Sequence, residues 1–173
     1  MMQGLGILLV LAAGIGIGIF RARELRERPK QIRAVIQALS ALEAQIVYAE
    51  LPLADGFRDC TAICREERVK RMFFLLAKRL SADKRCSSGE AFREIRSQVC
   101  EEMSLGQAEW NSLSFLCDNL GRTDCRETEK QIALSIEQLK ALESSAIAAA
   151  EKKGKAAVYL GICGALFVVL VCI

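Results

Sequence analysis

The side chains that most often carry out protein chemistry are scarce here, because the 173 residues include no histidine. Histidine is the commonest general base and metal ligand, and a Ser-His-Asp or Cys-His system cannot form without it. The sequence also lacks the GxxxxGK loop, followed by Ser or Thr, that holds nucleotide phosphates in many ATPases. We therefore expect a protein that is not an enzyme and that needs no cofactor.

The eight cysteines are the remaining candidates for metal or redox chemistry. Cys163 and Cys172 fall in an uncharged C-terminal segment. The other six are Cys60, Cys64, Cys86, Cys100, Cys117 and Cys125. No pair has CxxC spacing, and the four-residue spacing of Cys60 and Cys64 would need two further thiolates to make a zinc site. Because cysteine is also a common small core residue, we expect core packing and no metal.

Acidic pairs are a weaker candidate for acid–base chemistry. Glu66 with Glu67, and Glu101 with Glu102, are adjacent in the sequence, so the two members of each pair point to different helix faces. The run over residues 65–71 mixes both signs of charge, which is typical of a solvated face. These carboxylates are therefore expected to be exposed and without catalytic function.

The elements that would hold these residues follow from the distribution of charge. The chain has 24 Lys and Arg against 21 Asp and Glu, yet none of them falls in residues 1–20 or 156–173. An apolar helix of about 20 residues spans the roughly 30 Å hydrocarbon core of a bilayer. We therefore expect transmembrane helices over 1–20 and 156–173. The net charge of only +3 does not favour nucleic acid as a partner.

The orientation of the two spans follows from their flanks. Arginines follow the first span from Arg21 onward, and Lys152, Lys153 and Lys155 precede the second. The positive-inside rule then places residues 21–155 in the cytoplasm and both termini across the membrane. A cleaved signal peptide, the competing interpretation of residues 1–20, would carry its positive charge before the apolar run.

Small residues within the spans could let the two helices approach closely in lipid. Gly14 and Gly18 are four residues apart, as are Gly161 and Ala165. Glycine is also common in membrane helices that do not pack in this way. We therefore predict helix packing at these four positions as one of two alternatives.

The middle segment shows helical periodicity throughout, which predicts an all-α fold, a compact bundle of about six helices between the two spans. The first helix is expected to begin near Pro29 and to end before Pro52. Ser87 with Glu90, and Ser104 with Gln107, match the capping-box pattern of a helix start. A last, long helix is expected from about Thr123 or Asp124 over some 30 residues, after a left-handed Gly121.

Three stretches of this sequence resemble the stage III sporulation protein AB family of endospore-forming bacteria. They are RPKQIRAVIQALSALEAQIVYAELP (28–52), NLGRTD (119–124) with the following Gln131 and Leu139, and KKGKAAVYLGICGALFVVL (152–170). The resemblance covers essentially the whole chain, although residues 56–103 are less distinctive.

The resemblance implies a helical domain similar to the cytoplasmic domain of the inner-membrane platform proteins of type II secretion and type IV pilus machines. It implies a role in a secretion-like channel complex between mother cell and forespore, required for endospore formation. The protein would lie in the mother-cell membrane surrounding the forespore, with its bundle in the mother-cell cytoplasm and its termini in the intermembrane space. Its expected partners are a secretion-type ATPase, the stage III sporulation protein AA, and other stage III channel components.

The matching motifs nominate residues for partner contact. They are Arg28, Pro29, Gln31, Arg33, Arg122, Asp124 and Gln131. Each has a structural alternative: Pro29 and Asp124 suit helix starts, Arg28 and Arg33 suit a membrane flank, and an intramolecular ion pair is equally consistent with Arg122. The alternative function is a membrane scaffold that only self-associates into homo-oligomers and has no contact with the ATPase.

Overall fold

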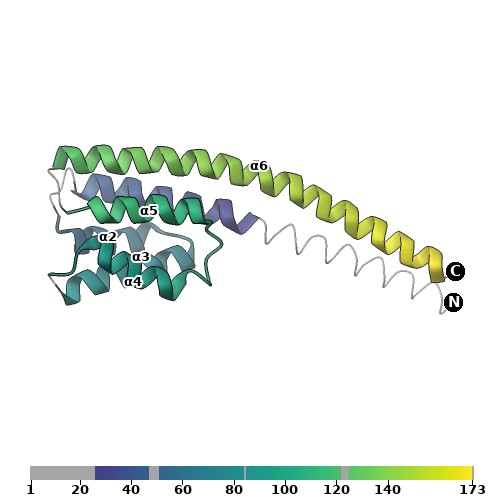
Figure 1. Cartoon of the computed structure of the whole chain (residues 1–173), viewed down its shortest axis with the longest axis horizontal. Helices are drawn as coiled ribbons and strands as arrows, with labels where there is room; N and C mark the ends of the chain where they lie inside the picture. The colour runs from purple at the N-terminus through teal and green to yellow at the C-terminus, as the bar shows by residue number, and fades with distance from the viewer. Residues whose placement is uncertain (1–25, 47–50, 84, 122–124, 173) are drawn as a thin grey trace. The chain divides into compact units, whose positions relative to one another are not determined.

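The computed structural model describes residues 26–46, 51–83, 85–121 and 125–172. Within these ranges it contains six helices and no strand, so the predicted all-α bundle of about six helices is confirmed (Figure 1). The chain divides into two compact units, one of residues Arg28–Ser144 and one of Met1–Glu27 with Ser145–Ile173. The first of these units holds the helical bundle, and the expected span over residues 1–20 lies outside the described residues.

The first helix covers residues 26–46 of the described chain. Its apolar residues recur at spacings of three and four, so they share one face that is removed from water. The fully buried members are Ile32, Val35, Leu39 and Leu42. The helix has already begun at residue 26, so the prediction that it begins near Pro29 is wrong by at least three residues.

Helices α2 (Leu53–Ile63) and α3 (Glu67–Ala82) pack against each other beside the first helix. Pro52 is the N-cap residue of α2, and the Glu66 side chain caps α3 by accepting a hydrogen bond from the Val69 N–H. The rings of Phe57 and Phe73 stack between the two helices with centroids 6.0 Å apart. Such a pair adds about 0.5–1.5 kcal/mol to the burial of its area.

Helices α4 (Ser88–Val99) and α5 (Gln107–Asn119) complete the sequence of neighbours, since α3 packs on α4 and α4 on α5. The capping box of Ser87 and Glu90 is present, as predicted. The second predicted capping box is wrong, because α5 begins after Gly106 and has no side-chain cap. Gly121 has φ of +83°, which confirms the predicted left-handed residue after this helix.

Helix α6 (Cys125–Cys172) is 48 residues long, so it extends beyond the predicted 30 residues or so and continues through Gly154. Its first part, up to Ser144, belongs to the bundle unit, where Ile132 and Leu139 are buried. A helix can pass a single glycine at a cost of only about 1 kcal/mol. Among the residues that the structure describes, no helix is both long enough and apolar enough to cross a membrane, so the two predicted spans remain predictions.

Candidate functional site

A salt bridge joins the beginning of the first helix to the first turn of α5. The Nε and Nη2 atoms of Arg28 both donate to Oε1 of Glu109, at 3.0 and 2.7 Å. The Glu109 side chain is fully buried, whereas the Arg28 side chain is 42% exposed. Negative charge in the first turn of a helix is also stabilised by the helix dipole. The pair therefore couples two segments 81 residues apart, while the other oxygen, Oε2 of Glu109, is buried without a hydrogen-bond partner among the described residues.

Gly106, the N-cap residue of α5, makes room for this salt bridge. A Cβ atom built at this position would lie only 2.7 Å from Arg28 Nη2 and 2.7 Å from Glu109 Oε2. The φ angle of Gly106 is −83°, which other residues adopt readily. Glycine is therefore needed here for the close approach of two side chains and not for its backbone freedom.

Gln31 occupies the next turn of the first helix and is also buried. Its Oε1 atom accepts a hydrogen bond from the backbone N–H of Ser104 at 2.8 Å. This contact explains why Ser104 does not begin a helix: its backbone is held by the first helix, and α5 begins three residues later. Gln31 and Glu109 thus hold the connection between α4 and α5 against the first helix.

The structure gives the other predicted partner-binding residues different surroundings. Pro29 is buried, Gln131 is half-buried on α6, and Arg122 and Asp124 lie outside the described residues. Arg33 is exposed, and its Nε atom donates to Glu143 Oε1 at 2.6 Å. The motif over residues 28–33 is therefore largely engaged in contacts within the chain. Partner binding by the seven predicted residues stays a prediction.

The four positions predicted for membrane helix packing are not tested here. Gly14 and Gly18 lie outside the described residues. Gly161 and Ala165 lie in the helical backbone of α6, and the structure does not describe their side-chain surroundings. Their role in packing stays a prediction.

The predicted core packing of the cysteines is confirmed for Cys60, Cys64 and Cys117 and is wrong for Cys100 and Cys163, which are exposed. The Sγ atoms of Cys60 and Cys64 lie 3.2 and 3.8 Å from the carbonyl oxygens of Ala38 and Ala34 in the first helix. Burial raises the pKa of Cys60 to about 12, and the neighbouring Cys64 thiol adds to this effect. Burial also raises the pKa of Cys64 to about 11. Thiols in this state are poor nucleophiles and poor metal ligands at neutral pH.

Cys117 on α5 is in the same state, because burial raises its pKa to about 12. The residues that the structure describes include no group of three or more His, Cys, Asp or Glu side chains arranged to hold a metal ion. The six free cysteines that it describes are Cys60, Cys64, Cys86, Cys100, Cys117 and Cys163.

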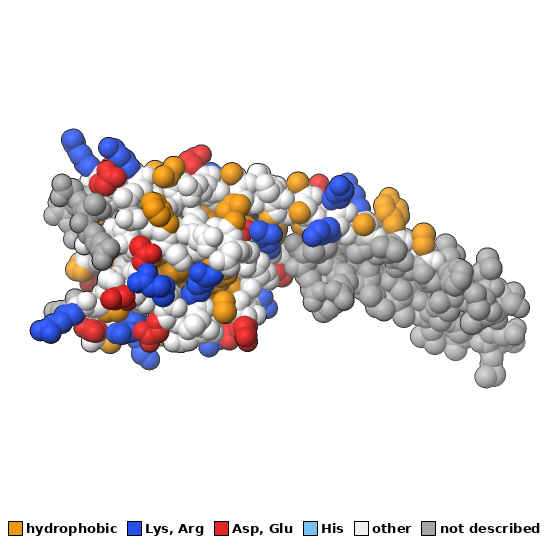
Figure 2. All heavy atoms as spheres, viewed as in Figure 1, with side chains coloured by type: hydrophobic (Ala, Val, Ile, Leu, Met, Phe, Trp, Pro, Cys, Tyr) orange, Lys and Arg blue, Asp and Glu red, His pale blue; other side chains and the backbone are white. Residues whose placement is uncertain are grey.

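An exposed aromatic residue on α3 is the surface feature that sequence reasoning missed. Phe74 is 53% exposed, although its neighbour Phe73 is buried. Phe74 lines two hollows in the surface, of about 470 and 490 Å³. Figure 2 shows acidic and basic side chains interspersed over one face of the bundle, with apolar side chains between them. The signal in the sequence was the Phe-Phe pair, since Phe73 falls within the apolar stripe of α3 and Phe74 falls outside it.

The described residues form an all-helical bundle in which buried polar side chains connect the helices. On its surface, an exposed aromatic ring lies among charged side chains. A family model described as stage III sporulation protein AB matches residues 3–173. The chain belongs to this family, so it is a member of a family of sporulation proteins.

Two further comparisons agree. The chain is similar to stage III sporulation protein AB of Bacillus subtilis (strain 168), with 29% identity over 171 residues and 98% of each chain covered. It is also similar to a solved structure of stage III sporulation protein AB, with a TM-score of 0.66 and 29% identity. That comparison covers 72% of this chain and 97% of the other.

Proposed function

We propose that the chain is a non-enzymatic membrane platform component of the secretion-like channel complex between mother cell and forespore. Its bundle docks the secretion-type ATPase of that complex, the stage III sporulation protein AA. Family membership over residues 3–173 supports the process in which it acts. The docking role extends the resemblance to secretion platform proteins.

The observation that carries this proposal is the continuity of α6. One helix runs from the buried Ile132 and Leu139 of the bundle to Cys172 at the end of the uncharged segment. A continuous helix of 48 residues can pass a displacement along its axis, because each turn is held by backbone hydrogen bonds. This arrangement suits a part that connects a cytoplasmic motor to a membrane channel.

The sequence of the C-terminal part of this helix supports a membrane anchor there. Residues 156–173 carry no charge, and three lysines lie directly before them. Residues 1–20 are likewise uncharged and are followed by arginines. With both segments as spans, the positive-inside rule places the bundle in the mother-cell cytoplasm and the termini in the intermembrane space.

Binding between the full chain in lipid nanodiscs and the purified ATPase tests the proposal. Light scattering or calorimetry should give saturable binding. The variant Lys130→Glu, on the exposed face of α6, should bind equally well and serves as a control for general charge effects. The absence of binding by a well-folded chain would contradict the docking role.

The scaffold alternative makes a different prediction in the same preparation. It expects oligomers that dissociate when Gly14, Gly18 or Gly161 is replaced by Leu, because a larger side chain keeps the helices apart. Oligomers of this kind together with an absence of ATPase binding would favour the scaffold over the platform.

A further inference from the structure

The outward face of α3 carries a cluster of basic residues around an exposed phenylalanine. We call this the α3 surface. Its residues are Arg68, Lys70, Arg71, Phe74 and Lys78 of α3, together with Arg58 of the neighbouring α2. Phe74 is the residue shared by both hollows, so each hollow has one wall made by its ring.

Packing within the bundle forces the Phe74 ring outward. Phe73 is 2% exposed and is stacked on Phe57, so the core side of α3 is already filled at this level. Consecutive residues of a helix point about 100° apart, which turns Phe74 toward water. Arg71 and Lys78 lie three residues before and four after Phe74, and so share its face of the helix.

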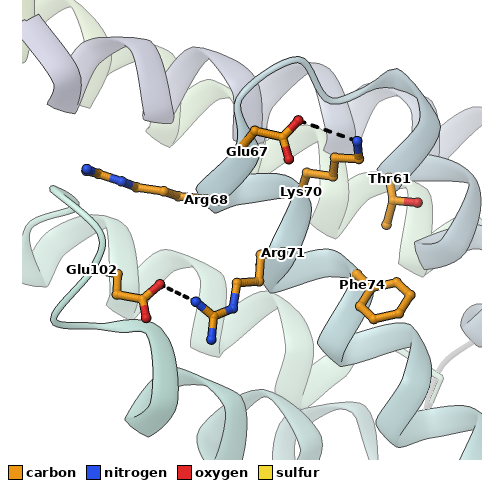
Figure 3. A pocket seen from close by; sticks show the side chains of 7 residues that line it. All are labelled: Thr61, Glu67, Arg68, Lys70, Arg71, Phe74 and Glu102. Carbon is orange, nitrogen blue, oxygen red and sulfur yellow. Dashed lines mark hydrogen bonds and ion pairs between the residues drawn. The ribbon is translucent and has the colours of Figure 1, made fainter.

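The charges of the α3 surface are not balanced within the chain. Lys70 pairs with Glu67 at 3.5 Å, and Arg71 pairs with Glu102 at 2.6 Å (Figure 3). The exposed side chains of Arg68 and Lys78 have no ion-pair partner among the residues that the structure describes. The two hollows are together lined by five basic residues against two carboxylates.

The two hollows differ in a way that indicates the chemistry of an occupant. The hollow on the Lys78 side is lined by Arg58, Phe74, Ala77, Lys78, Ser81 and Ala82, without a carboxylate. A carboxylate entering there would meet the unpaired Lys78 and, beside it, Arg58, which is paired with Asp55 at 3.1 Å. An apolar side chain next to that carboxylate would cover the exposed ring. Exposed ion pairs alone contribute little, so burial of Phe74 has to supply much of the affinity.

We propose that the α3 surface docks an acidic segment of a partner protein, one that places a non-polar side chain against Phe74 between its carboxylates. In the membrane platform this partner is the ATPase, and that assignment rests on the proposed function above. A protein segment fits better than a lipid surface, because a segment can place its carboxylates beside Arg68 and Lys78 and away from Glu67 and Glu102, whereas anionic headgroups would face all four. The surface is also hollowed beside Phe74, whereas a bilayer is flat.

The test compares variants of the full chain in phosphatidylcholine nanodiscs for binding to the purified ATPase. Phe74→Ser and the double variant Arg68→Glu with Lys78→Glu should each weaken binding by about tenfold or more. Two matched controls, Phe115→Ser on α5 and Lys130→Glu on α6, should change it by less than about twofold. Phe115 is 56% exposed, so its replacement removes an equally accessible ring.

Folding and salt dependence complete the comparison. All four variants should keep the circular dichroism spectrum and urea midpoint of the wild type, because none of the altered side chains is buried. Binding by the wild type should weaken as salt is added, and binding by the Arg68 and Lys78 double variant should depend less on salt. ATPase binding that is equal in the wild type and in both α3-surface variants would overturn the proposal.

A second experiment tests the α3 surface independently of the proposed function. Its probe is a short fluorescent peptide in which glutamates flank a leucine, compared with the same peptide carrying lysines in place of the glutamates. If the wild-type chain binds no ATPase, the platform function fails, but binding of the acidic peptide that Phe74→Ser abolishes still supports the surface. Equal binding of both peptides would overturn it. The proposal would also be overturned if the double variant Arg68→Glu with Lys78→Glu lost binding to phosphatidylglycerol vesicles but bound the ATPase as well as the wild type does.

Discussion

At the scale of single residues, the polar groups of this chain are used for packing between distant segments. Arg28 and Gln31, which the family motif brought to attention, contact Glu109 and Ser104 within the chain. An arginine whose planar group suits a partner's carboxylate is here bound to a carboxylate of its own protein. The alternative given by the sequence for Arg28 was a membrane-flank charge, so its salt bridge with Glu109 is a contact that the sequence did not suggest at this position.

The Arg28–Glu109 salt bridge predicts an asymmetry between two substitutions. Arg28→Met leaves a fully buried carboxylate without its cation and should lower the free energy of unfolding by about 3 kcal/mol. Glu109→Gln leaves an arginine that is already 42% exposed and can be hydrated, so the loss should be about 1–2 kcal/mol. Urea unfolding of the fragment of residues 21–155, followed by circular dichroism, measures both.

Arg65→Met is the control for this pair, since Arg65 is exposed and the structure gives it no ion pair within the described chain. Its effect should stay within about 0.5 kcal/mol. A larger loss in Glu109→Gln than in Arg28→Met would show that burial of the carboxylate does not dominate the energetics.

The buried thiols give a second prediction at this scale. Iodoacetamide at neutral pH should modify the exposed Cys100 in the folded protein and leave Cys60, Cys64 and Cys117 intact. Burial blocks access to these three, and their raised pKa values keep them protonated. Mass spectrometry of tryptic peptides, with and without urea, gives the pattern. Modification of Cys117 before Cys100 would be inconsistent with the bundle.

The same thiols make the fold sensitive to alkali. A thiol whose pKa is higher in the folded than in the unfolded chain stabilises the fold at any pH at which it is protonated in both. Above the ordinary thiol pKa the unfolded chain loses its protons first, so the fold should become less stable as the pH rises toward about 12.

At the scale of helices, local sequence patterns account well for the elements. The spacing of Ile32, Val35, Leu39 and Leu42 places them on one face, and all four are buried. The Ser87 capping box also forms as the pattern predicts, because both of its hydrogen bonds join residues three apart. Ser104 matches the same pattern but does not cap a helix, because Gln31 holds its N–H from another helix.

The continuity of α6 predicts a separation between folding and function. Ala148 is exposed on α6 and follows the boundary of the bundle unit at Ser144. Ala148→Pro would remove a backbone hydrogen bond at a cost of about 3 kcal/mol to the helix locally. We expect the urea midpoint of the bundle to stay unchanged, while spore formation falls to the level of a strain that lacks the protein.

Ala148→Ser is the matched control, since it changes the side chain but keeps the helix. Complementation of an endospore-forming host without its own stage III sporulation protein AB provides the measurement. Normal spore formation by Ala148→Pro would contradict a role of α6 in connecting bundle and membrane.

At the scale of the whole molecule, the proposed platform depends on which side of the membrane the bundle faces. Its topology can be read from Cys100 once Cys86, Cys125, Cys163 and Cys172 are changed to Ser, because the remaining thiols are buried. A membrane-impermeant maleimide should label Cys100 in inverted membrane vesicles and not in intact cells. Detergent-solubilised protein is the positive control, and labelling in intact cells would place the bundle on the opposite side.

Local patterns in the sequence determined the all-α class, most of the buried helix faces, the Ser87 cap and the left-handed Gly121. These features depend on residues within a few positions of each other, so periodicity and capping rules are sufficient to predict them. The absence of histidine can also be read from the composition alone, and it excludes general-base catalysis and metal binding by an imidazole.

The tertiary structure alone decided the contacts between distant residues. Nothing near Arg28 indicates Glu109, which lies 81 positions away, and nothing near Ser104 indicates Gln31. Likewise, the periodicity of α3 places Phe73 on the buried face but does not indicate Phe57 of α2 as its stacking partner. The physical reason is that helical periodicity specifies a buried face, whereas the partners of that face are set by how the helices pack together.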